Sequence, residues 1–377
     1  MTILLVDDNQ VNLFVIEKIL NNAGYSNCVS FKSALELFDY LQLESLTPNE
    51  QVELILLDIM MPEIDGIEAC RRIQQVEKLR DIPIIFITAL EDTNKLAEAL
   101  DVGGTDYVTK PINKTELIAR IRVALRLKYE KDWHKQQELK LRNELDLATQ
   151  VQKSLLNPPL KESNIQIQVS HVPSFKLGGD MYHWQKIDEH RYAIILLDMM
   201  GHGLSASLVC MFISSVLRDM MSRLVDPEVV IKDLNRYMAH LHNPNNCINY
   251  YFTAIYLVID TENKTVEYVN AGHPPGFVRV DGETLISIDR GSCPVGLFDK
   301  LEVQKSVIQY KNDIQILLYT DGVVDANIPQ EEIMINKMQS LTMQKWEMDE
   351  SPIHLFLPEE KHVNQPDDMC ILMIQAK

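Results

Sequence analysis

Residues 194–206 read IILLDMMGHGLSA, an apolar run that stops at Asp198 and leads into a histidine with a glycine on each side. Consecutive branched apolar residues predict a buried strand, and glycine after it permits a sharp turn. The stretch LILLDIMMPEIDG at 54–66 has the same local arrangement around Asp58. The two stretches share nothing further along, so they do not form a repeat. Each one predicts an acid held at the end of a buried strand.

Length and charge limit what the chain can be. A length of 377 residues favours two or more domains. The net charge of -18 argues against broad binding of nucleic acids or anionic membranes, because both would be repelled. No apolar run approaches the roughly 18 residues that span a bilayer, and the start MTILLVDDNQ is no signal peptide. Six scattered cysteines without a CxxC pair are typical of reduced thiols. We therefore expect a soluble, cytoplasmic protein.

Residues 1–124 alternate short apolar strands with helical stretches. Strands are expected at 3–6, 54–57 and 82–88, with a weaker one near 105–110. Strand–helix alternation of this kind predicts a parallel sheet with helices on both faces, which is an α/β fold.

A long helix is expected between the two parts of the chain. From Thr115 to about Leu156 there is no glycine or proline, and Asn157-Pro158-Pro159 ends the pattern. Apolar residues recur at steps of four and three near its end, at Leu141, Leu145, Ala148 and Leu155, with Gln152 between them. This is coiled-coil spacing, although Lys131 and Glu138 occupy the earlier positions of the same seam. We assign residues 125–159 to a helical linker.

Residues 160–377 are rich in strands, with two helical patterns at 205–224 and 227–242. Strands and helices occur in blocks, which predicts an α+β domain with an antiparallel sheet or sandwich. Residues 329–362 are left unassigned.

The first group of acids consists of Asp7, Asp8 and Asp58, each directly after an apolar strand. Strand ends of a parallel sheet meet at one edge, and three carboxylates there would repel one another unless a hard cation lay between them. Thr88 and Lys110 follow two further strands and could contact a phosphoryl group. Each residue alone is more often a helix cap, a turn residue or a solvated lysine, but their joint order favours a site.

This order of motifs over residues 2–124 resembles the receiver domain of two-component response regulators. The resemblance implies a doubly wound five-stranded parallel sheet, with Asp58 as phosphoacceptor and a histidine kinase as partner. It also implies one Mg²⁺, held by Asp7, Asp8, Asp58 and the Met60 carbonyl. The implied switch residues are Thr88, Tyr107 and the phosphate-binding Lys110.

The second group of acids lies downstream in LGGD, LLDMMGHG, LLYTDG and QPDDM. The acids are Asp180, Asp198, Asp321 and the pair Asp367-Asp368. Oxygen ligands without a cysteine–histidine pair suit Mg²⁺ or Mn²⁺ better than Zn²⁺. Two such ions about 3.5–4 Å apart can activate a water for attack on a phosphate ester. The alternative is that these acids only cap turns and that His202 is a structural histidine.

Further signatures accompany these acids, namely ELDLATQVQKSLL, GGDMYHW, NAGHPPGF, YTDGVVDA and PDDMCILMI. With them, residues 138–377 resemble the PPM (PP2C-like) serine/threonine phosphatases of the SpoIIE type, which act in bacterial partner-switching pathways. The resemblance implies an antiparallel β-sandwich flanked by helices over 160–377, and two Mn²⁺ or Mg²⁺. The implied ligands are Asp198 between both ions, Asp180 and the Met199 carbonyl on one ion, and Asp321 with Asp367 on the other. Asp325 aligns with a third-metal ligand of some relatives, and His183 stands where many relatives carry aspartate.

The order receiver, helix, phosphatase suggests that phosphorylation at Asp58 controls hydrolysis through the helix, with residues 138–157 changing register or order in a homodimer. The resemblance implies that the substrate is a phosphorylated anti-sigma factor antagonist. One rival is a non-catalytic adaptor that uses the phosphatase fold only for binding. Another is a DNA-binding regulator, which the charge of -18 and the lack of a basic recognition helix disfavour.

Overall fold

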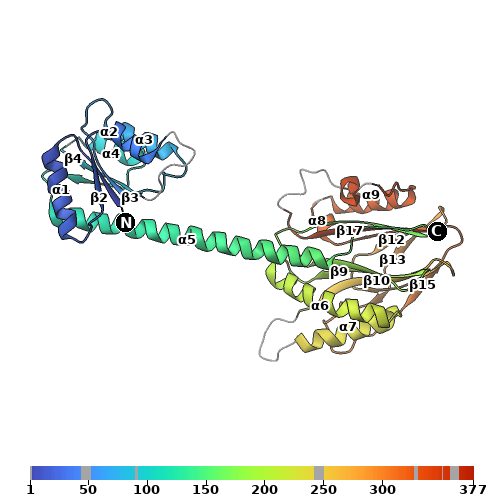
Figure 1. The fold of residues 1–377 in the computed structure, drawn as a ribbon. Coiled ribbons are helices and arrows are strands. Elements are labelled where there is room, and N and C mark those ends of the chain that lie inside the picture. Colours follow the sequence, from blue (N-terminus) through green and yellow to red (C-terminus); the bar gives the residue numbers. More distant parts are fainter. Residues whose placement is uncertain are drawn as a thin grey trace. The chain divides into compact units, whose positions relative to one another are not determined.

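The computed structural model describes residues 2–43, 52–89, 92–241, 250–326, 330–349, 351–356 and 365–377. The chain divides into two compact units, Met1–Leu141 and Arg142–Lys377. Each unit is described by itself (Figure 1).

The first unit is built on one parallel sheet with the strand order β2-β1-β3-β4-β5. Its strands are β1 (Thr2–Val6), β2 (Cys28–Phe31), β3 (Val52–Asp58), β4 (Ile84–Thr88) and β5 (Asp106–Thr109). Its helices are α1 (Gln10–Asn22), α2 (Ala34–Leu41), α3 (Gly66–Gln75), α4 (Thr93–Asp101) and the start of α5 (Lys114–Leu155). One core packs α1 and α5 on one face of the sheet, and a second core packs α2, α3 and α4 on the other. The predicted doubly wound fold is confirmed.

Helix starts in this unit follow ordinary capping chemistry. Asn9 precedes α1, and its side chain accepts a hydrogen bond from the backbone N–H of Val11. Asp65 precedes α3 and accepts from the N–H of Glu68 in the same way. Such caps satisfy amide groups that the helix leaves open. They fix where each helix leaves the sheet edge that carries the acids.

Helix α5 runs for 42 residues, within one residue of the expected helix at each end. Its last turns pack within the second unit: Gln152 is buried, while Leu145, Ala148 and Leu155 are half-buried. Leu147 and Val151 on another face are 62% and 55% exposed. Leu145, Ala148 and Leu155 are therefore partly covered within the second unit, whereas Leu141 of the same spacing is 56% exposed. The coiled-coil interpretation of this stretch stays a prediction.

The second unit contains two six-stranded sheets. The first has the order β14-β11-β10-β9-β8 with β15 paired to β11, and the second has the order β13-β12-β16-β17-β7-β6. Neighbours are antiparallel except for the short parallel pair β11–β14. The strands of the first sheet are β8 (Asp180–Lys186), β9 (Arg191–Met199), β10 (Phe252–Asp260), β11 (Thr265–Ala271), β14 (Gly291–Ser292) and β15 (Ser306–Gln309). Those of the second are β6 (Leu160–Lys161), β7 (Ile165–Val172), β12 (Gly276–Val280), β13 (Thr284–Ile288), β16 (Ile314–Tyr319) and β17 (Met369–Ala376).

The two sheets face each other across an apolar core, and helices cover their outer faces (Figure 1). Helices α6 (Leu204–Arg223) and α7 (Pro227–Leu241) lie on the first sheet. Helices α8 (Gly322–Asp325), α9 (Glu331–Met343) and α10 (Pro352–Phe356) lie on the second. The predicted sandwich flanked by helices is confirmed, as are the two helices expected near 205–224 and 227–242.

The segment left unassigned at 329–362 contains α9 and α10, apart from residues 329, 350 and 357–362, which lie outside the described part of the chain. The expectation about membrane-length apolar segments needs a correction. Helix α6 is long and apolar enough to cross a bilayer by length and composition, and 44% of that window is buried. Core helices of soluble proteins pass the same test, and α6 packs on the first sheet through Ala206, Ile213 and Leu217.

Candidate functional site

The first acid group lies at the carboxyl edge of the parallel sheet. The carboxylate oxygens of Asp7, Asp8 and Asp58 lie within 4.8 Å of one another, and among the described residues this is the one group of three or more possible metal ligands with that spacing. Asp7 and Asp58 are 1% and 3% exposed, whereas Asp8 is exposed. The sequence prediction that these three acids converge is confirmed in the geometry.

Lys110 lies between two of these carboxylates. Its Nζ donates to Asp58 Oδ2 at 2.7 Å and to Asp7 Oδ2 at 2.9 Å. Burial raises the pKa of Asp58, and the hydrogen bond from Lys110 opposes that rise. Burial lowers the pKa of Lys110, but its bonds with Asp58 and Asp7 outweigh burial and the net pKa is raised. The ammonium therefore stays charged and pairs with the acids.

The other predicted receiver residues lie around this group. Thr88, at the end of β4, is fully buried, and Tyr107 and Lys110 lie in and just after β5. The N–H of Met60 donates to Asp58 Oδ1 at 3.2 Å, and the Met60 side chain is exposed. The strand ends thus bring the predicted set to one edge.

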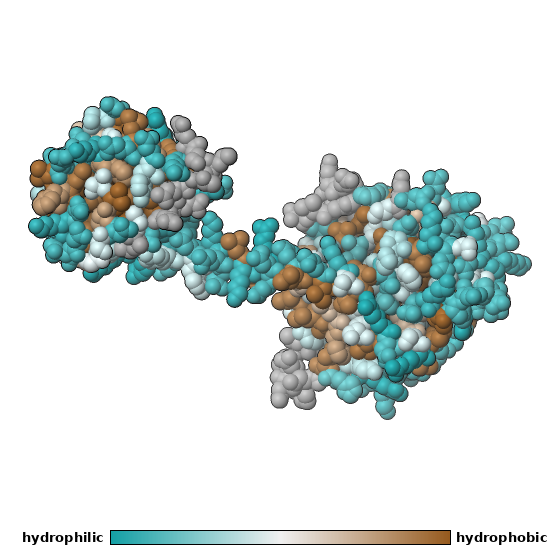
Figure 2. Space-filling view, viewed as in Figure 1, coloured by the Kyte–Doolittle hydropathy of each residue, from teal (hydrophilic) through white to brown (hydrophobic). Residues whose placement is uncertain are grey.

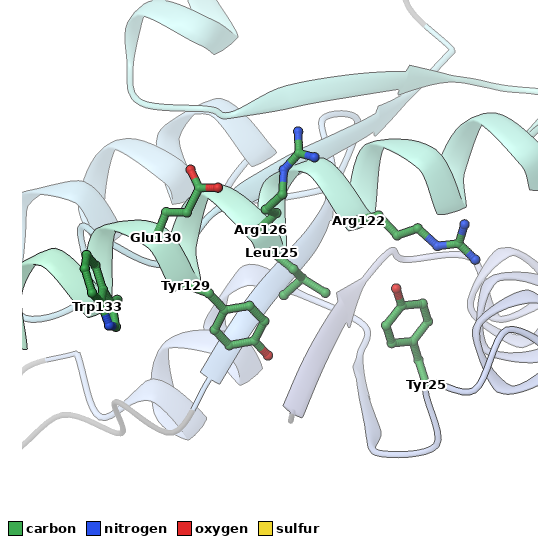
Figure 3. Close-up of a pocket in the computed structure, with 7 residues that line it drawn as sticks. All are labelled: Tyr25, Arg122, Leu125, Arg126, Tyr129, Glu130 and Trp133. Atoms are coloured by element: carbon green, nitrogen blue, oxygen red, sulfur yellow. The ribbon is translucent and has the colours of Figure 1, made fainter.

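A second hollow in this unit has a different character. A groove of about 490 Å³ runs along α5. Figure 3 shows its lining residues, with Tyr25 across from the helix. Its lining is Tyr25, Arg122, Leu125, Arg126, Tyr129, Glu130 and Trp133. The Tyr129 hydroxyl donates to Glu53, and this bond raises the pKa of Tyr129 to about 12. The groove contains one carboxylate, so it offers no acid cluster for chemistry.

The second acid group draws two acids from each sheet of the sandwich. Asp180 begins β8 and Asp198 lies near the end of β9, where the two are direct cross-strand neighbours. Asp321 follows β16, and Asp367 precedes β17, the neighbour of β16. The four predicted acids therefore gather at one rim of the sandwich because adjacent strand ends present them there.

Electrostatics show that these acids interact. Burial and the charge of Asp198 raise the pKa of Asp180 well above its usual range. Burial and the charges of Asp321 and Asp367 raise the pKa of Asp198 to about 7. Desolvation by the surrounding protein and neighbouring carboxylates also raise the pKa values of Asp321 and Asp367. Asp180 is buried, Asp198 and Asp367 are half-buried, and Asp321 is exposed. Neighbouring like charges that are partly withdrawn from water destabilise the fold unless a cation compensates them.

The donor set fits divalent ions that prefer oxygen. It consists of carboxylates, and Met199, whose carbonyl was the fifth predicted ligand, ends β9 directly after Asp198. The four acids do not reach the mutual spacing of the receiver group. Carboxylates spread over a wider rim suit two ions better than one. Mg²⁺ or Mn²⁺ would therefore be the fitting occupants.

Only one acid of the Asp367-Asp368 pair has a carboxylate available to an ion. Asp368 is 2% exposed, and its oxygens accept from Ser174 N, Ser174 Oγ and Gly179 N at 2.6, 2.9 and 2.6 Å. Asp367 is half-buried at the rim, and its Oδ1 accepts from the N–H of Asp368. This arrangement supports Asp367 as the candidate ligand.

Supporting residues that the sequence did not reveal hold the acids in place. Thr320 Oγ1 donates to Asp180 Oδ2 at 2.6 Å and accepts from Cys370 N at 2.8 Å, so it links β8 to the second sheet. The His273 ring lies between Thr253 Oγ1 at 2.8 Å and the Tyr319 carbonyl at 3.0 Å. The motifs YTDG and NAGH contained both residues, but sequence alone did not show what they contact.

Glycine is required at Gly322, directly after Asp321. A Cβ there would lie 2.0 Å from the carbonyl oxygen of Asp368. The two loops that carry Asp321 and Asp367 therefore touch backbone to backbone. Gly201 and Gly203, on either side of His202, both have a φ of +80° that side chains rarely adopt.

The end of α5 binds the loop that leads to Asp180. We name residues 174–179 the GGD loop. Gln152 Nε2 donates to the Gly178 carbonyl at 2.6 Å, and the Gly178 N–H donates to Gln152 Oε1 at 3.2 Å. Thr149 Oγ1 donates to the Lys176 carbonyl at 3.0 Å, and Lys176 pairs with Asp146. One face of the helix thus holds the backbone of this loop.

His202, Asp325 and His183, which the sequence singled out, differ in burial and in their neighbours. His202 is exposed, and its charge lowers the pKa of Asp367 against the larger effect of burial. Asp325 is half-buried in α8 beside Asp321. His183 is 4% exposed, no hydrogen-bond partner of its ring is found among the described residues, and burial lowers its pKa to about 4. His183 is therefore a core residue here.

Known families match both units. The model of the family Stage II sporulation protein E (SpoIIE) matches residues 188–377, half of the chain, and that of the response regulator receiver domain matches residues 3–122. The phosphoserine phosphatase RsbP of Bacillus subtilis strain 168 is 40% identical over 188 residues, which is 50% of this chain and 47% of RsbP. The phosphate regulon regulator PhoB of Pseudomonas aeruginosa is 38% identical over 125 residues, which is 33% of this chain and 52% of PhoB.

The chain thus spans about half the length of the curated relatives it matches. Among solved structures, the SiaA-PP2C domain of Pseudomonas aeruginosa has a TM-score of 0.50 at 15% identity. The match covers 64% of this chain and 98% of that domain. At this identity the likeness concerns the fold alone.

Proposed function

Since the chain belongs to the SpoIIE family and begins with a response regulator receiver domain, we propose that it is a metal-dependent protein serine/threonine phosphatase controlled by phosphorylation of Asp58. The observation that carries the proposal is the meeting of Asp180 and Asp198 from one sheet with Asp321 and Asp367 from the other, with raised pKa values. A group of carboxylate oxygens of this kind suits two divalent ions that prefer oxygen ligands.

Each group at the rim has a part in this proposal. Asp198 would hold both ions, Asp180 and the Met199 carbonyl one of them, and Asp321 and Asp367 the other. The ions, Mn²⁺ or Mg²⁺, would supply a hydroxide for in-line attack on a phosphoester.

Neighbouring side chains would keep the acids in position. Thr320 orients Asp180 through its hydroxyl, and Gly322 lets the loop of Asp321 pack against that of Asp367. His273 links β10 to the end of β16, and this bond braces the loop that follows.

The receiver would act as the input. We propose Asp58 as phosphoacceptor for a cognate histidine kinase, with one Mg²⁺ held by Asp7, Asp8, Asp58 and the Met60 carbonyl. Lys110 already lies 2.7 Å from the Asp58 carboxylate, where it would offset the charge of a phosphoryl group. Thr88 and Tyr107 would report phosphorylation.

The GGD loop is the proposed point where the signal reaches the phosphatase. Gln152 of α5 forms two hydrogen bonds with the backbone of Gly178, two residues before Asp180. A shift in register of the helix would move this loop and with it the Asp180 carboxylate. We therefore expect weak activity without phosphorylation and higher activity with it.

Partners follow from the same reasoning. The proposed substrate is a phosphorylated anti-sigma factor antagonist, in keeping with the phosphoserine phosphatase activity named for RsbP.

Apolar side chains gather on the second unit around α5 and α6 in Figure 2, and Leu147, Val151, Leu204 and Leu208 are each at least half exposed. Such a surface supports contact with a second copy of the chain at the end of the helical linker. We propose that the homodimer also uses the receiver. Nucleic acid and membrane are not among the proposed partners, and the proposed location is the cytoplasm.

Hydrolysis of an aryl phosphate tests the proposal. The full chain is assayed with EDTA, Mg²⁺ or Mn²⁺, before and after phosphorylation by a small phosphodonor. We expect ion-dependent turnover, higher after phosphorylation, and none from Asp198→Asn. Asp58→Asn should keep the basal rate and lose the increase. If the wild-type chain binds an antagonist protein but hydrolyses nothing with either ion, the non-catalytic adaptor is the better account.

A further inference from the structure

Two separate segments of the chain hold the GGD loop. Gln152 and Thr149 of α5 bind its backbone at Gly178 and Lys176. The Asp368 carboxylate binds Ser174 and Gly179, the two ends of the loop. A rigid loop between these contacts would pass a displacement of the helix to Asp368.

Asp368 has little freedom to absorb such a displacement. Its carboxylate accepts three hydrogen bonds of 2.6 to 2.9 Å, all from the GGD loop. A Cβ placed on Gly178 would lie 3.0 Å from the same carboxylate, so the loop packs directly against it. Charge-assisted bonds to a buried carboxylate are about twice as strong as neutral ones. The loop and Asp368 therefore move together.

The backbone of Asp368 connects to both candidate ligands of the second sheet. Its N–H donates to Asp367 Oδ1 at 2.8 Å. Its carbonyl oxygen lies against Gly322, where even a methyl group would come within 2.0 Å. Gly322 follows Asp321 directly in sequence. A movement of Asp368 would thus shift Asp367 and Asp321 at the same time.

We propose that Asp368 is a positioning residue that couples the GGD loop to Asp367 and Asp321, so that α5 adjusts ligands on both sheets through one loop. The inference rests on the proposed function and names the route of its regulation. A displacement of α5 would pass to Asp180 directly along the chain, because Asp180 follows Gly179. The same displacement would pass to Asp367 and Asp321 through Asp368. A shift of α5 would then change the affinity for metal ions more than it changes the rate of the hydrolysis step.

The test compares Asp368→Asn with a matched control. The asparagine keeps the shape of the side chain but turns an amide N–H₂ toward Gly179 N–H or toward Ser174, so at least one of three bonds is lost. Ser174→Ala removes only the hydroxyl bond and should give a smaller effect. Asp313→Asn is the control, because Asp313 also lies in this unit and pairs with Arg279 at 2.9 Å, at the other end of β16.

Three measurements are made on the full chain. Asp368→Asn loosens the residue whose backbone N–H binds Asp367. Calorimetry with Mn²⁺ should therefore show an affinity about 10- to 100-fold lower, the range typical when the outer partners of metal ligands are disturbed. Turnover of an aryl phosphate at saturating Mn²⁺ should stay within about threefold of wild type, since the ligands themselves remain. Hydrogen exchange at the Ser174 and Gly179 amides should become faster, and Asp313→Asn should leave it unchanged. Phosphorylation of Asp58 should alter Mn²⁺ affinity in wild type and lose most of that effect in Asp368→Asn.

The outcomes separate this inference from the proposed function. Unchanged Mn²⁺ affinity and amide exchange in Asp368→Asn would overturn the coupling, as would an equal loss in Asp313→Asn. If the wild-type chain takes up no Mn²⁺ and hydrolyses nothing, the proposed function fails and the coupling fails with it. In that case, faster amide exchange at Ser174 and Gly179 in Asp368→Asn would show only that Asp368 contacts the GGD loop.

Discussion

Replacing Asp198 by asparagine should make the metal-free protein more stable at alkaline pH. The pKa of Asp198 rises from 3.8 to about 7 in the folded chain because of burial and the charges of Asp321 and Asp367. A difference of about 3 units corresponds to about 4 kcal/mol. Asp180 shares part of this titration, so the expected gain from Asp198→Asn is about 2–4 kcal/mol.

The sign follows from which state binds the proton. The folded chain holds the Asp198 proton up to about pH 7, whereas the unfolded chain releases it near 3.8. Stability therefore falls as pH rises between these values, and the full cost is present above pH 7. An asparagine carries no such cost. The gain should be largest at pH 8, less than half as large at pH 5, and absent near pH 3.5.

Urea unfolding of the EDTA-treated full chain measures this gain. A Trp133→Phe background leaves Trp184 and Trp346, both in the second unit, as fluorescent reporters. Asp349→Asn, at a side chain that is 81% exposed, is the control and should change stability by less than about 0.5 kcal/mol. Mn²⁺ at 100 times its dissociation constant should add about 2.7 kcal/mol to the Asp198 protein and much less to the variant. A variant that is no more stable than its parent at pH 8 would refute the assignment of mutual repulsion at the rim.

Three further substitutions probe other contacts. Lys110→Met should destabilise the first unit by about 3–5 kcal/mol, because two buried carboxylates lose their cation; Mg²⁺ should restore part of this in thermal unfolding, and no loss would contradict the pairing. Thr320→Val should cost about 1–3 kcal/mol and weaken Mn²⁺ uptake in calorimetry, since Asp180 loses its hydroxyl donor. Gly322→Ala should cost about 1–3 kcal/mol and abolish turnover, because its Cβ would overlap the Asp368 carbonyl oxygen; a fully active variant would mean that the two loops are not in contact.

Much of the architecture could be predicted because strand patterns are local. Apolar runs that end in Asp58 and Asp198 predicted buried strands with acids at their ends. Asp58 ends β3 of the first unit and Asp198 lies near the end of β9 of the second, as expected. The spacing at Leu145 and Ala148 correctly marked a face of α5 that packs. It did not say against what, and the partner is the chain's own second unit.

What the sequence did not reveal depends on contacts between distant segments. The family resemblance implied Asp367 as the ligand, but the residues of the Asp367-Asp368 doublet do not show what Asp368 does. Its role follows only when the GGD loop, nearly two hundred residues earlier, is placed against it. Gln152 stood between the apolar residues at the end of the helix, and the sequence did not show that its amide binds the backbone of Gly178. Helix α6 was missed as a membrane-length apolar segment because its polar residues are spread along it.

The origin of the four acids in two different sheets has a mechanical consequence. Across most of the sandwich the sheets meet through closely packed apolar side chains, which interdigitate and keep the two layers in register. Ions bound at the rim would link Asp198 to Asp321, residues more than a hundred positions apart, and would so connect one sheet directly to the other. Chelation would remove this link, so the metal-free protein should be more mobile at this edge of the sandwich than at the opposite one.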